Sequence, residues 1–431
     1  MDYLQQWFDH NEKQLIDTAA QIFEHPETAY HEHESAKYLA AFLANQGFEI
    51  EWNAVGLETA FTASWGQGAP IIGFLAEYDA LPGLGQKAVC THAPTGTAGH
   101  GCGHNLLGTG AAAAACALKA DFEANNVSAT LRVYGCPAEE IMSGKIIMNQ
   151  QGLFSDLSAA VTWHPFDLNR ISNDIWLAQD IKNYRFYGIT SHAARFPELG
   201  RSALDAAELM NVGVNYLREH VTDDVRIHYS YTSSSQPANV VPDYAELNYF
   251  IRSAKRERTD DAAARVDDCA RGAALMTGTK VEIESVSSCR EMKVNRTLAE
   301  LYYQAMTQIP VPEYTEDELA FARNISREAG LKNDGTFFMG LQELEPTPQI
   351  LPIGTDVSDV SHTIPTITLS GACMCRGTPL HHWSTTAQAG MSIGQKGMIY
   401  IAKCMALGTK MLIHDPQALK AAWEEHQKED S

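Results

Sequence analysis

The stretch Gly99-His100-Gly101-Cys102-Gly103-His104-Asn105 places a thiol and imidazoles between glycines. Glycine lets the backbone bend tightly and expose the neighbouring side chains. A thiolate and an imidazole two residues apart can bind the same divalent ion or two adjacent ions. A flexible loop with incidental polar residues would have the same composition. This stretch alone therefore leaves both interpretations open.

A second candidate is the pair Glu139-Glu140, which follows an apolar run and a Cys-Pro turn. Adjacent acids most often belong to a solvated face. Two neighbouring carboxylates can also divide the work of hydrolysis, one binding a metal ion and the other taking a proton from water. Their mutual repulsion then requires a cation nearby.

Three further candidates are His164 in Thr-Trp-His-Pro, the pair His381-His382, and Asp79 after a short apolar run. An acid in the position of Asp79 can bind a metal ion or orient a ligand from behind. Each of these residues alone is as readily structural or superficial. A cysteine, several histidines and several acids gathered at strand ends and loops together predict a metal site.

Apolar runs predict the strands that position these residues. Each of three short runs ends in one of the polar stretches, and helical periodicity separates the runs. This alternation is typical of a doubly wound α/β fold, in which sites gather outside the carboxyl ends of the strands. The predicted strands are Ile71–Leu75, Leu131–Tyr134 and Ala159–Thr162, and the predicted helices are Leu4–Phe23, Glu34–Gln46 and Gly108–Lys119.

The pattern changes near residue 180. From there the order strand–helix–strand–strand–helix–strand predicts an inserted α+β domain at 180–292. The catalytic domain then comprises 1–179 and 293–431. Residues 315–349 mix glycines, prolines and charges and give no clear element.

Composition excludes several classes of protein. The chain is 45% hydrophobic and 20% charged, as in ordinary globular proteins. Its net charge of −21 disfavours nucleic acid and anionic membrane surfaces as partners. Nine scattered cysteines indicate reduced thiols and therefore the cytoplasm. We find no secretory signal and no apolar run long enough to cross a membrane.

The motifs resemble, in order and over nearly the whole chain, the dinuclear metallo-amidohydrolases that include aminoacylase, carboxypeptidase G and indoleacetyl-amino-acid hydrolase. The matching stretches are AEYDALPGL (76–84), GHGCGHNLLGT (99–109), YGCPAEE (134–140), TWHP (162–165), NVV (239–241), TDVSDVS (355–361) and GTPLH (377–381). The resemblance implies a zinc-peptidase-like catalytic domain with an inserted ferredoxin-like lid. It also implies a homodimer or higher homo-oligomer formed through that lid.

The resemblance also implies a role for each matching residue. The cofactor would be two divalent ions, Mn or Zn. Glu139 matches the general base, Asp79 an acid that orients the site, and His192 a histidine that stabilises the oxyanion in a neighbouring subunit. Asn239 and Arg252 match a pair that binds the substrate carboxylate. Without the resemblance, His192 would be a capping or surface residue and Arg252 an exposed strand residue. The implied metal ligands are Cys102, His104, Glu140, His164 and His381.

These residues predict hydrolysis of an amide-type C–N bond in a small carboxylate-bearing substrate, such as an N-acyl or N-aroyl amino acid of the aminobenzoyl-glutamate kind. Metal binding lowers the pKa of water toward about 7, and a carboxylate base can shuttle its proton. Departures from the family pattern at Ile141, Met142, His362 and His382 leave alternatives open. They are a deaminase that releases ammonia from an aminobenzoate, a dipeptidase, and an inactive or partner subunit of a hetero-oligomer.

Overall fold

The computed structural model describes residues 3–233 and 236–428, which form two compact units. The first unit comprises Met1–Asp174, Lys293–Gln349 and Asp359–Ser431. The second comprises Ile175–Met292 together with Ile350–Ser358. Within the described residues, no helix combines the length and the apolar character that a membrane span requires.

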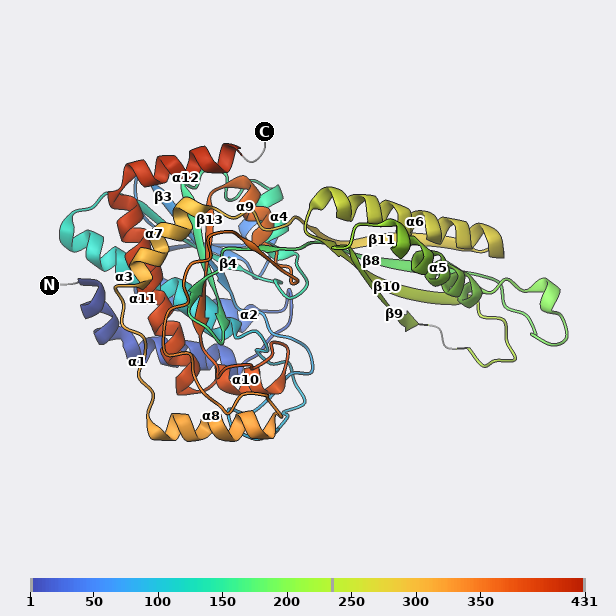
Figure 1. The fold of residues 1–431 in the computed structure, drawn as a ribbon, viewed down its shortest axis with the longest axis horizontal. Coiled ribbons are helices and arrows are strands. Elements are labelled where there is room, and N and C mark those ends of the chain that lie inside the picture. The colour runs from blue at the N-terminus through green and yellow to red at the C-terminus, as the bar shows by residue number, and fades with distance from the viewer. Residues whose placement is uncertain (1–2, 234–235, 429–431) are drawn as a thin grey trace. The chain divides into compact units, whose positions relative to one another are not determined.

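A seven-stranded sheet forms the centre of the first unit, with the strand order β1-β2-β4-β3-β5-β13-β6 (Figure 1). The inner strands β4, β3, β5 and β13 run parallel, and antiparallel strands complete both edges. The bounds are β1 Glu49–Trp52, β2 Phe61–Gly66, β3 Ile71–Glu77, β4 Thr130–Cys136, β5 Ala159–Phe166, β6 Arg170–Ile171 and β13 Thr366–Ala372.

The parallel strands bring the polar stretches to one edge of this sheet. The last residue of β3, Glu77, is paired in register with the last residue of β4, Cys136. Parallel strands end at the same edge, so the residues that follow β3 and β4 lie beside the end of β5. The three predicted strands are confirmed, each extended by a few residues beyond its apolar run.

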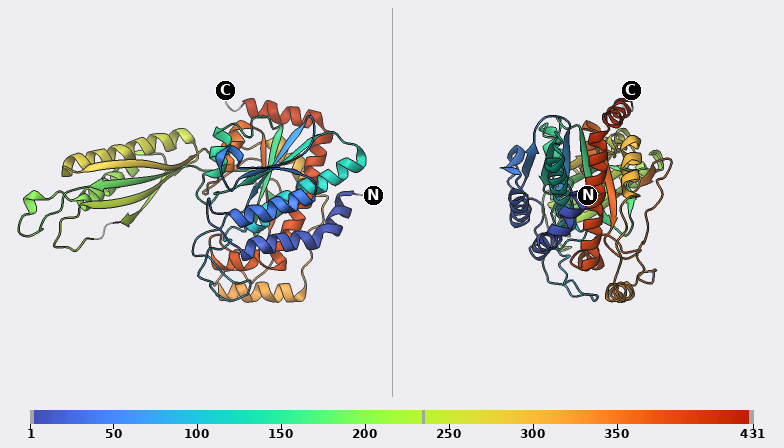
Figure 2. Two further views of the ribbon diagram at one scale, coloured as in Figure 1. Left: turned by 180° about the vertical axis from the view of Figure 1, so that it is seen from behind. Right: turned by 90° about the vertical axis from the view of Figure 1, so that its left-hand side faces the viewer.

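Two long helices pack against the sheet, α3 (His104–Asn125) and α11 (Ser392–His414), and α1 (Tyr3–Glu24) packs against both. The view from behind in Figure 2 shows α1 in dark blue beside α11 in red. Residues 111–115 of α3 are alanines with no exposed surface, so α3 approaches its neighbours closely. The other helices of the chain outside the inserted segment are α2 His33–Asn45, α4 Gly144–Gln150, α7 Arg296–Met306, α8 Glu316–Glu328, α9 Val357–Thr363, α10 Trp383–Ala389 and α12 Pro416–Lys428. The short strands β7 (Asp174–Trp176) and β12 (Gln349–Leu351) pair with each other.

The second unit is an antiparallel four-stranded sheet with the order β11-β8-β10-β9. Helices α5 and α6 pack on one face of it and on each other. Numbered within the unit, the strand order is 4-1-3-2, which is the ferredoxin-like arrangement and confirms the predicted α+β fold class. The bounds are β8 Ala178–Tyr187, α5 Ala203–Leu217, β9 Arg226–Ser233, β10 Tyr244–Ser253, α6 Arg256–Thr277 and β11 Lys280–Cys289.

The segment without a clear predicted element contains helix α8. A capping box begins this helix: the Thr315 side chain accepts from the Glu318 backbone N–H, and the Glu318 carboxylate accepts from the Thr315 N–H. This reciprocal pattern satisfies two N–H groups that the first helical turn leaves without intrahelical partners.

Candidate metal centre

Cys102 and His104 lie where a loop enters helix α3. The intervening Gly103 has a φ of +75°, which only glycine adopts readily, and an added Cβ would meet the ring of Pro165 at 3.1 Å. His104 is therefore the first residue of α3 and is fully buried. Its Nδ1 lies 2.9 Å from Asp79 Oδ1, which leaves Nε2 as the nitrogen that can bind an ion.

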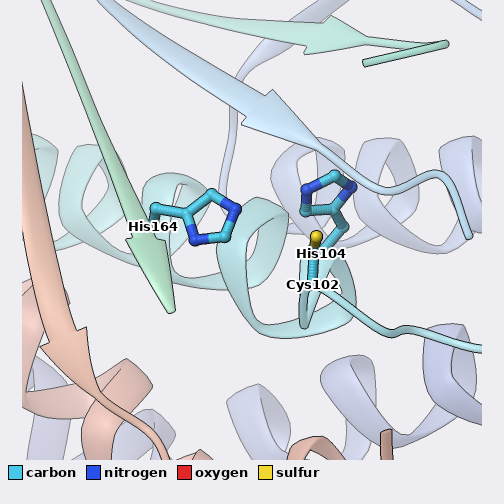
Figure 3. A group of neighbouring side chains, drawn as sticks. All are labelled: Cys102, His104 and His164. Carbon is cyan, nitrogen blue, oxygen red and sulfur yellow. The ribbon is translucent and has the colours of Figure 1, made fainter. Parts of the chain in front are cut away.

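His164 points from the end of β5 toward Cys102 and His104 (Figure 3). Its Nδ1 lies 2.8 Å from the carbonyl oxygen of Pro165, so Nε2 is the free ligand atom. Burial lowers the pKa of His164 to about 4, and the imidazole is neutral and able to bind a metal ion at pH 7. Ligand atoms of Cys102, His104 and His164 lie within 4.8 Å of one another.

A second triad combines Cys102 with Glu140 and His381, and its ligand atoms also lie within 4.8 Å of one another. His381 Nε2 lies 3.1 Å from Cys102 Sγ and 3.4 Å from Glu140 Oε2. The two triads share the thiol of Cys102. This geometry suits two adjacent ions with a thiolate between them.

The chemistry of the donors fits divalent metal ions. His104 Nε2 and Glu140 Oε1 are buried, and neither atom has a hydrogen-bond partner among the described residues. Burial, followed by the charges of Glu140 and Glu139, raises the pKa of the Cys102 thiol well above its usual range. A thiolate at this position therefore requires positive charge close by, and bound cations supply it.

Asp79 links the two triads from behind. Its Oδ1 contacts His104, and its Oδ2 accepts a 2.8 Å hydrogen bond from the backbone N–H of Glu140. Asp79 has no exposed surface. One carboxylate thus fixes the ring of one potential ligand and the backbone of another, which is the orienting geometry of an outer-shell acid.

The paired glutamates lie on a strained turn. Ala138 and Met142 have φ values of +59° and +52°, and His381 has +56°. Such conformations cost roughly 1–3 kcal/mol each for residues other than glycine and cluster at functional sites. Glu139 is 8% exposed, and its Oε2 lies 3.9 Å from His104 Nε2. The turn therefore holds Glu139 beside the first triad.

Sequence reasoning passed over three buried charged residues near this centre. Glu77 Oε2 lies 3.3 Å from His104 Nε2, and Lys145 Nζ lies 2.8 Å from Glu77 Oε1. Burial opposes the charge of Glu77, but Lys145 and then His104 hold its pKa below the usual range. Strand alternation could have identified Glu77, which is two residues from Asp79 and so on the same face. No pattern in the sequence marked Lys145 or Glu32.

His382 is a helix cap. Its Nδ1 accepts from the backbone N–H of Ser384 at the start of α10 and lies 2.7 Å from the Ser384 hydroxyl. Of the two adjacent histidines, His381 is the one whose ring contacts Cys102 and Glu140. His362 lies in the last turn of α9, and Ile141 is 39% exposed beside the glutamate pair.

The three remaining predicted site residues lie in the second unit. His192 Nδ1 accepts from the backbone N–H groups of Ala194 and Arg195, both at 3.3 Å, which leaves the ring proton on Nε2. Asn239 is exposed, and its backbone oxygen accepts from Ala193 N–H at 3.0 Å. Arg252, on β10, is half-buried, and its Nε has no hydrogen-bond partner within the part of the chain that the structure describes.

The chain is similar to known proteins over most of its length. The family model described as Peptidase family M20/M25/M40 matches residues 73–383. One of the two p-aminobenzoyl-glutamate hydrolase subunits of Escherichia coli is 42% identical, covering 96% of this chain and 92% of that protein. The mouse Xaa-Arg dipeptidase is 32% identical, covering 69% of this chain and 68% of that protein.

A solved structure shows the same fold. It is the YXEP protein of Bacillus subtilis, described as a dinuclear metal binding peptidase from the M20 family. The TM-score is 0.60 at 18% identity, covering 92% of this chain and 98% of that one. With the family match and the identity to its relatives, these likenesses establish that this chain belongs to peptidase family M20/M25/M40 and is a hydrolase of carbon–nitrogen bonds.

Proposed function

We propose that this chain hydrolyses the amide bond of an N-aroyl or N-acyl amino acid, with p-aminobenzoyl-glutamate as the first substrate to test. The observation that carries the proposal is the pair of ligand triads that share Cys102. It occurs in a chain that is 42% identical to the p-aminobenzoyl-glutamate hydrolase subunit named above.

We assign two divalent ions, Mn or Zn, to the two triads. His104 and His164 would hold one ion, Glu140 and His381 the other, and Cys102 both. Bound ions supply Lewis acidity, which lowers the pKa of water toward about 7 and offsets the negative charge that develops on the amide oxygen. One thiolate favours a borderline-soft metal such as Zn, while the carboxylate and imidazoles suit either metal.

The chain's own groups move the proton and bind the substrate. The Glu139 carboxylate, beside His104, accepts a proton from water and returns it to the leaving amine. His192 carries its ring proton on Nε2, and this N–H can donate to the oxyanion. Arg252 has a half-buried guanidinium whose Nε has no partner among the described residues, which suits bidentate binding of a substrate carboxylate. Asn239 is the proposed second donor to that carboxylate.

Product analysis tests this function. The purified chain is loaded with Mn or Zn and incubated with p-aminobenzoyl-glutamate, and the products are identified by chromatography. Equal amounts of p-aminobenzoate and glutamate are expected. Ammonia released from an aminobenzoate, without any amino acid product, would contradict amide hydrolysis and indicate deamination. Activity that arises only when the other type of p-aminobenzoyl-glutamate hydrolase subunit is added would indicate a hetero-oligomer.

A dipeptidase is a second candidate, favoured by the 32% identity to the Xaa-Arg dipeptidase. The two functions share the metal centre and the carboxylate-binding residues, and they differ in the acyl group. Parallel assays with p-aminobenzoyl-glutamate and with dipeptides that end in arginine compare the two values of kcat/KM. We expect the larger value for p-aminobenzoyl-glutamate.

We further assign homodimer formation to the second unit. One face of α5 exposes Leu209, Val212 and Tyr216, which are 38%, 50% and 68% exposed. β9 is an edge strand of the same unit, and Tyr231 of β9 is bonded to Asn211 of α5. An apolar row beside a free sheet edge is typical of an interface between protein chains. Sedimentation of Val212→Asp should show a monomer, whereas Leu275→Asp, at the end of α6, should remain dimeric. A fully active wild-type monomer would contradict this assignment.

All nine cysteines are free thiols, and seven of them are buried. Buried, unpaired thiols suit a reducing compartment. We therefore place the enzyme in the cytoplasm, and fractionation of cells that express a tagged chain tests that location.

A further inference from the structure

A fully buried lysine lies beside the metal centre. Lys145 is in the first turn of α4 and has no exposed surface. Its Nζ lies 2.8 Å from Oε1 of Glu77, which is the last residue of β3 and is itself buried. Lysines are almost never fully buried unless they are paired. This ion pair is therefore a specific feature of the site.

The other oxygen of Glu77 faces the metal-binding side of His104. Glu77 Oε2 lies 3.3 Å from His104 Nε2, while Asp79 engages the opposite nitrogen, Nδ1. Glu139 Oε2 lies 3.9 Å from the same Nε2, and ligand atoms of Glu77, His104 and Glu139 lie within 4.8 Å of one another. Glu77 thus contributes a carboxylate to the surroundings of the ion that His104 would hold.

Charge explains why the lysine is needed. Glu77, Asp79, Glu139 and Glu140 all lie within 4 Å of the His104 ring nitrogens. Four carboxylates so close together repel one another, and burial strengthens the repulsion. A lysine on the far oxygen of Glu77 offsets one of these charges without occupying a ligand position. It also fixes the direction in which the second oxygen of Glu77 points.

We propose that Lys145 and Glu77 form a positioning pair for His104 and its ion: Lys145 fixes Glu77 and offsets its charge, and Glu77 strengthens ion binding by the Cys102–His104–His164 triad. Both residues act through His104 and its ion, and neither is assigned a contact with substrate. The inference rests on the proposed function in one respect, namely that the triads hold metal ions. It adds two residues that set the affinity for one of them.

Metal titration of the metal-free full-length chain tests the pair. Co²⁺ is the probe, because binding to the Cys102 thiolate produces a charge-transfer absorption that reports occupancy independently of activity. The variants are Glu77→Gln and the double variant Glu77→Gln/Lys145→Met. The control is Asp121→Asn, which breaks another buried carboxylate–lysine pair on α3, formed with Lys410 at 2.8 Å.

The expected result is a selective loss in Glu77→Gln. This change leaves Lys145 positively charged beside a cation site, and the affinity for one of the two Co²⁺ ions should fall at least tenfold, within the range of about 10–100-fold typical of outer-shell partners. The double variant removes both charges and should bind Co²⁺ within about threefold of wild type. Replacing a buried ion pair by neutral residues is often tolerated, and so the double variant also guards against a failure of the single variant to fold.

Three outcomes would overturn the proposal: wild-type affinity in Glu77→Gln, an equal loss in Asp121→Asn, or a double variant as weak as Glu77→Gln. A wild-type chain that binds no Co²⁺ would overturn this proposal and the metal assignment together. A wild-type chain that binds two ions and yet hydrolyses no amide would contradict the proposed function alone, and the titration would still decide the role of the pair.

Discussion

Glu32 accepts a 2.9 Å hydrogen bond from the backbone N–H of Ala138, the residue that precedes the paired glutamates. Its other oxygen accepts from the Thr59 hydroxyl at 3.0 Å, and the residue has no exposed surface. Glu32 lies directly before α2, more than a hundred residues from the turn that it contacts. A single carboxylate therefore supports the left-handed backbone that aims Glu139.

Replacing Glu32 by glutamine should flatten the dependence of stability on pH. Burial, followed by the charge of Asp79, raises the pKa of Glu32 from 4.5 to about 7. Since the folded-state pKa is raised, the stabilising contribution is fully present below pH 4.5 and is lost as the pH rises through about 7. The loss is on the order of 3 kcal/mol at most, and glutamine cannot ionise. Denaturant unfolding of the metal-free chain at pH 5 and pH 8 measures the difference. Glu58→Gln, at an exposed carboxylate, is the control and should retain the wild-type slope.

Glu139→Gln and Glu140→Gln should separate proton transfer from metal binding. The first variant removes the proposed base, and we expect kcat to fall roughly 10²–10⁴-fold while both ions remain bound. The second removes a ligand from the triad of Cys102 and His381, and we expect loss of one ion. Metal analysis and initial rates on the same preparations provide both measurements. Loss of metal from Glu139→Gln would count against its role as base.

Cysteine and histidine substitutions should change the metal count differently. Cys102 belongs to both triads, whereas His164 belongs to one. We therefore expect Cys102→Ala to lose both ions and His164→Ala to retain one when each variant is dialysed against dilute metal. Elemental analysis per mole of chain gives the count. His100→Ala is a useful control, because His100 is buried and bonded to the Ile22 backbone oxygen, outside both triads. Equal counts in the Cys102 and His164 variants would contradict the shared thiolate.

Arg252→Met should weaken substrate binding more than catalysis. A hydrogen bond between charged groups contributes about 1.5–3 kcal/mol, and so KM should rise roughly tenfold or more while kcat stays within about threefold. Arg226→Met on the neighbouring strand, whose Cα is paired with that of Arg252, is the control. With a substrate whose carboxylate is amidated, Arg252→Met and wild type should have similar kcat/KM. A persistent difference there would argue against carboxylate binding.

The sequence predicted most of the fold because its strongest signals are local. Continuous apolar runs marked β3, β4 and β5, and the strand–helix–strand–strand–helix–strand order of the second unit was legible from periodicity. His104 was expected in a loop, but it begins α3, because Gly103 takes the left-handed conformation and lets the helix start there. Helix α8 was missed, although Thr315 and Glu318 have the spacing of a capping box.

The charged residues behind the candidate site could not be predicted from the sequence. Lys145 and Glu32 lie in segments without a motif, and their roles depend on contacts with Glu77 and Ala138, which are distant in the chain. Contacts of this kind are set by packing, which local periodicity does not encode. The role of His382 as a cap likewise became clear only from its bond to Ser384.

The order of the ligands along the chain has a consequence for biosynthesis. Cys102, His104 and His164 all precede the inserted segment, whereas His381 follows it. During synthesis from the N-terminus, one triad is present in the emerging chain long before the other can be completed. A polypeptide that stops short of residue 381 retains the first triad and lacks the second. Full metal loading therefore distinguishes finished molecules from incomplete ones.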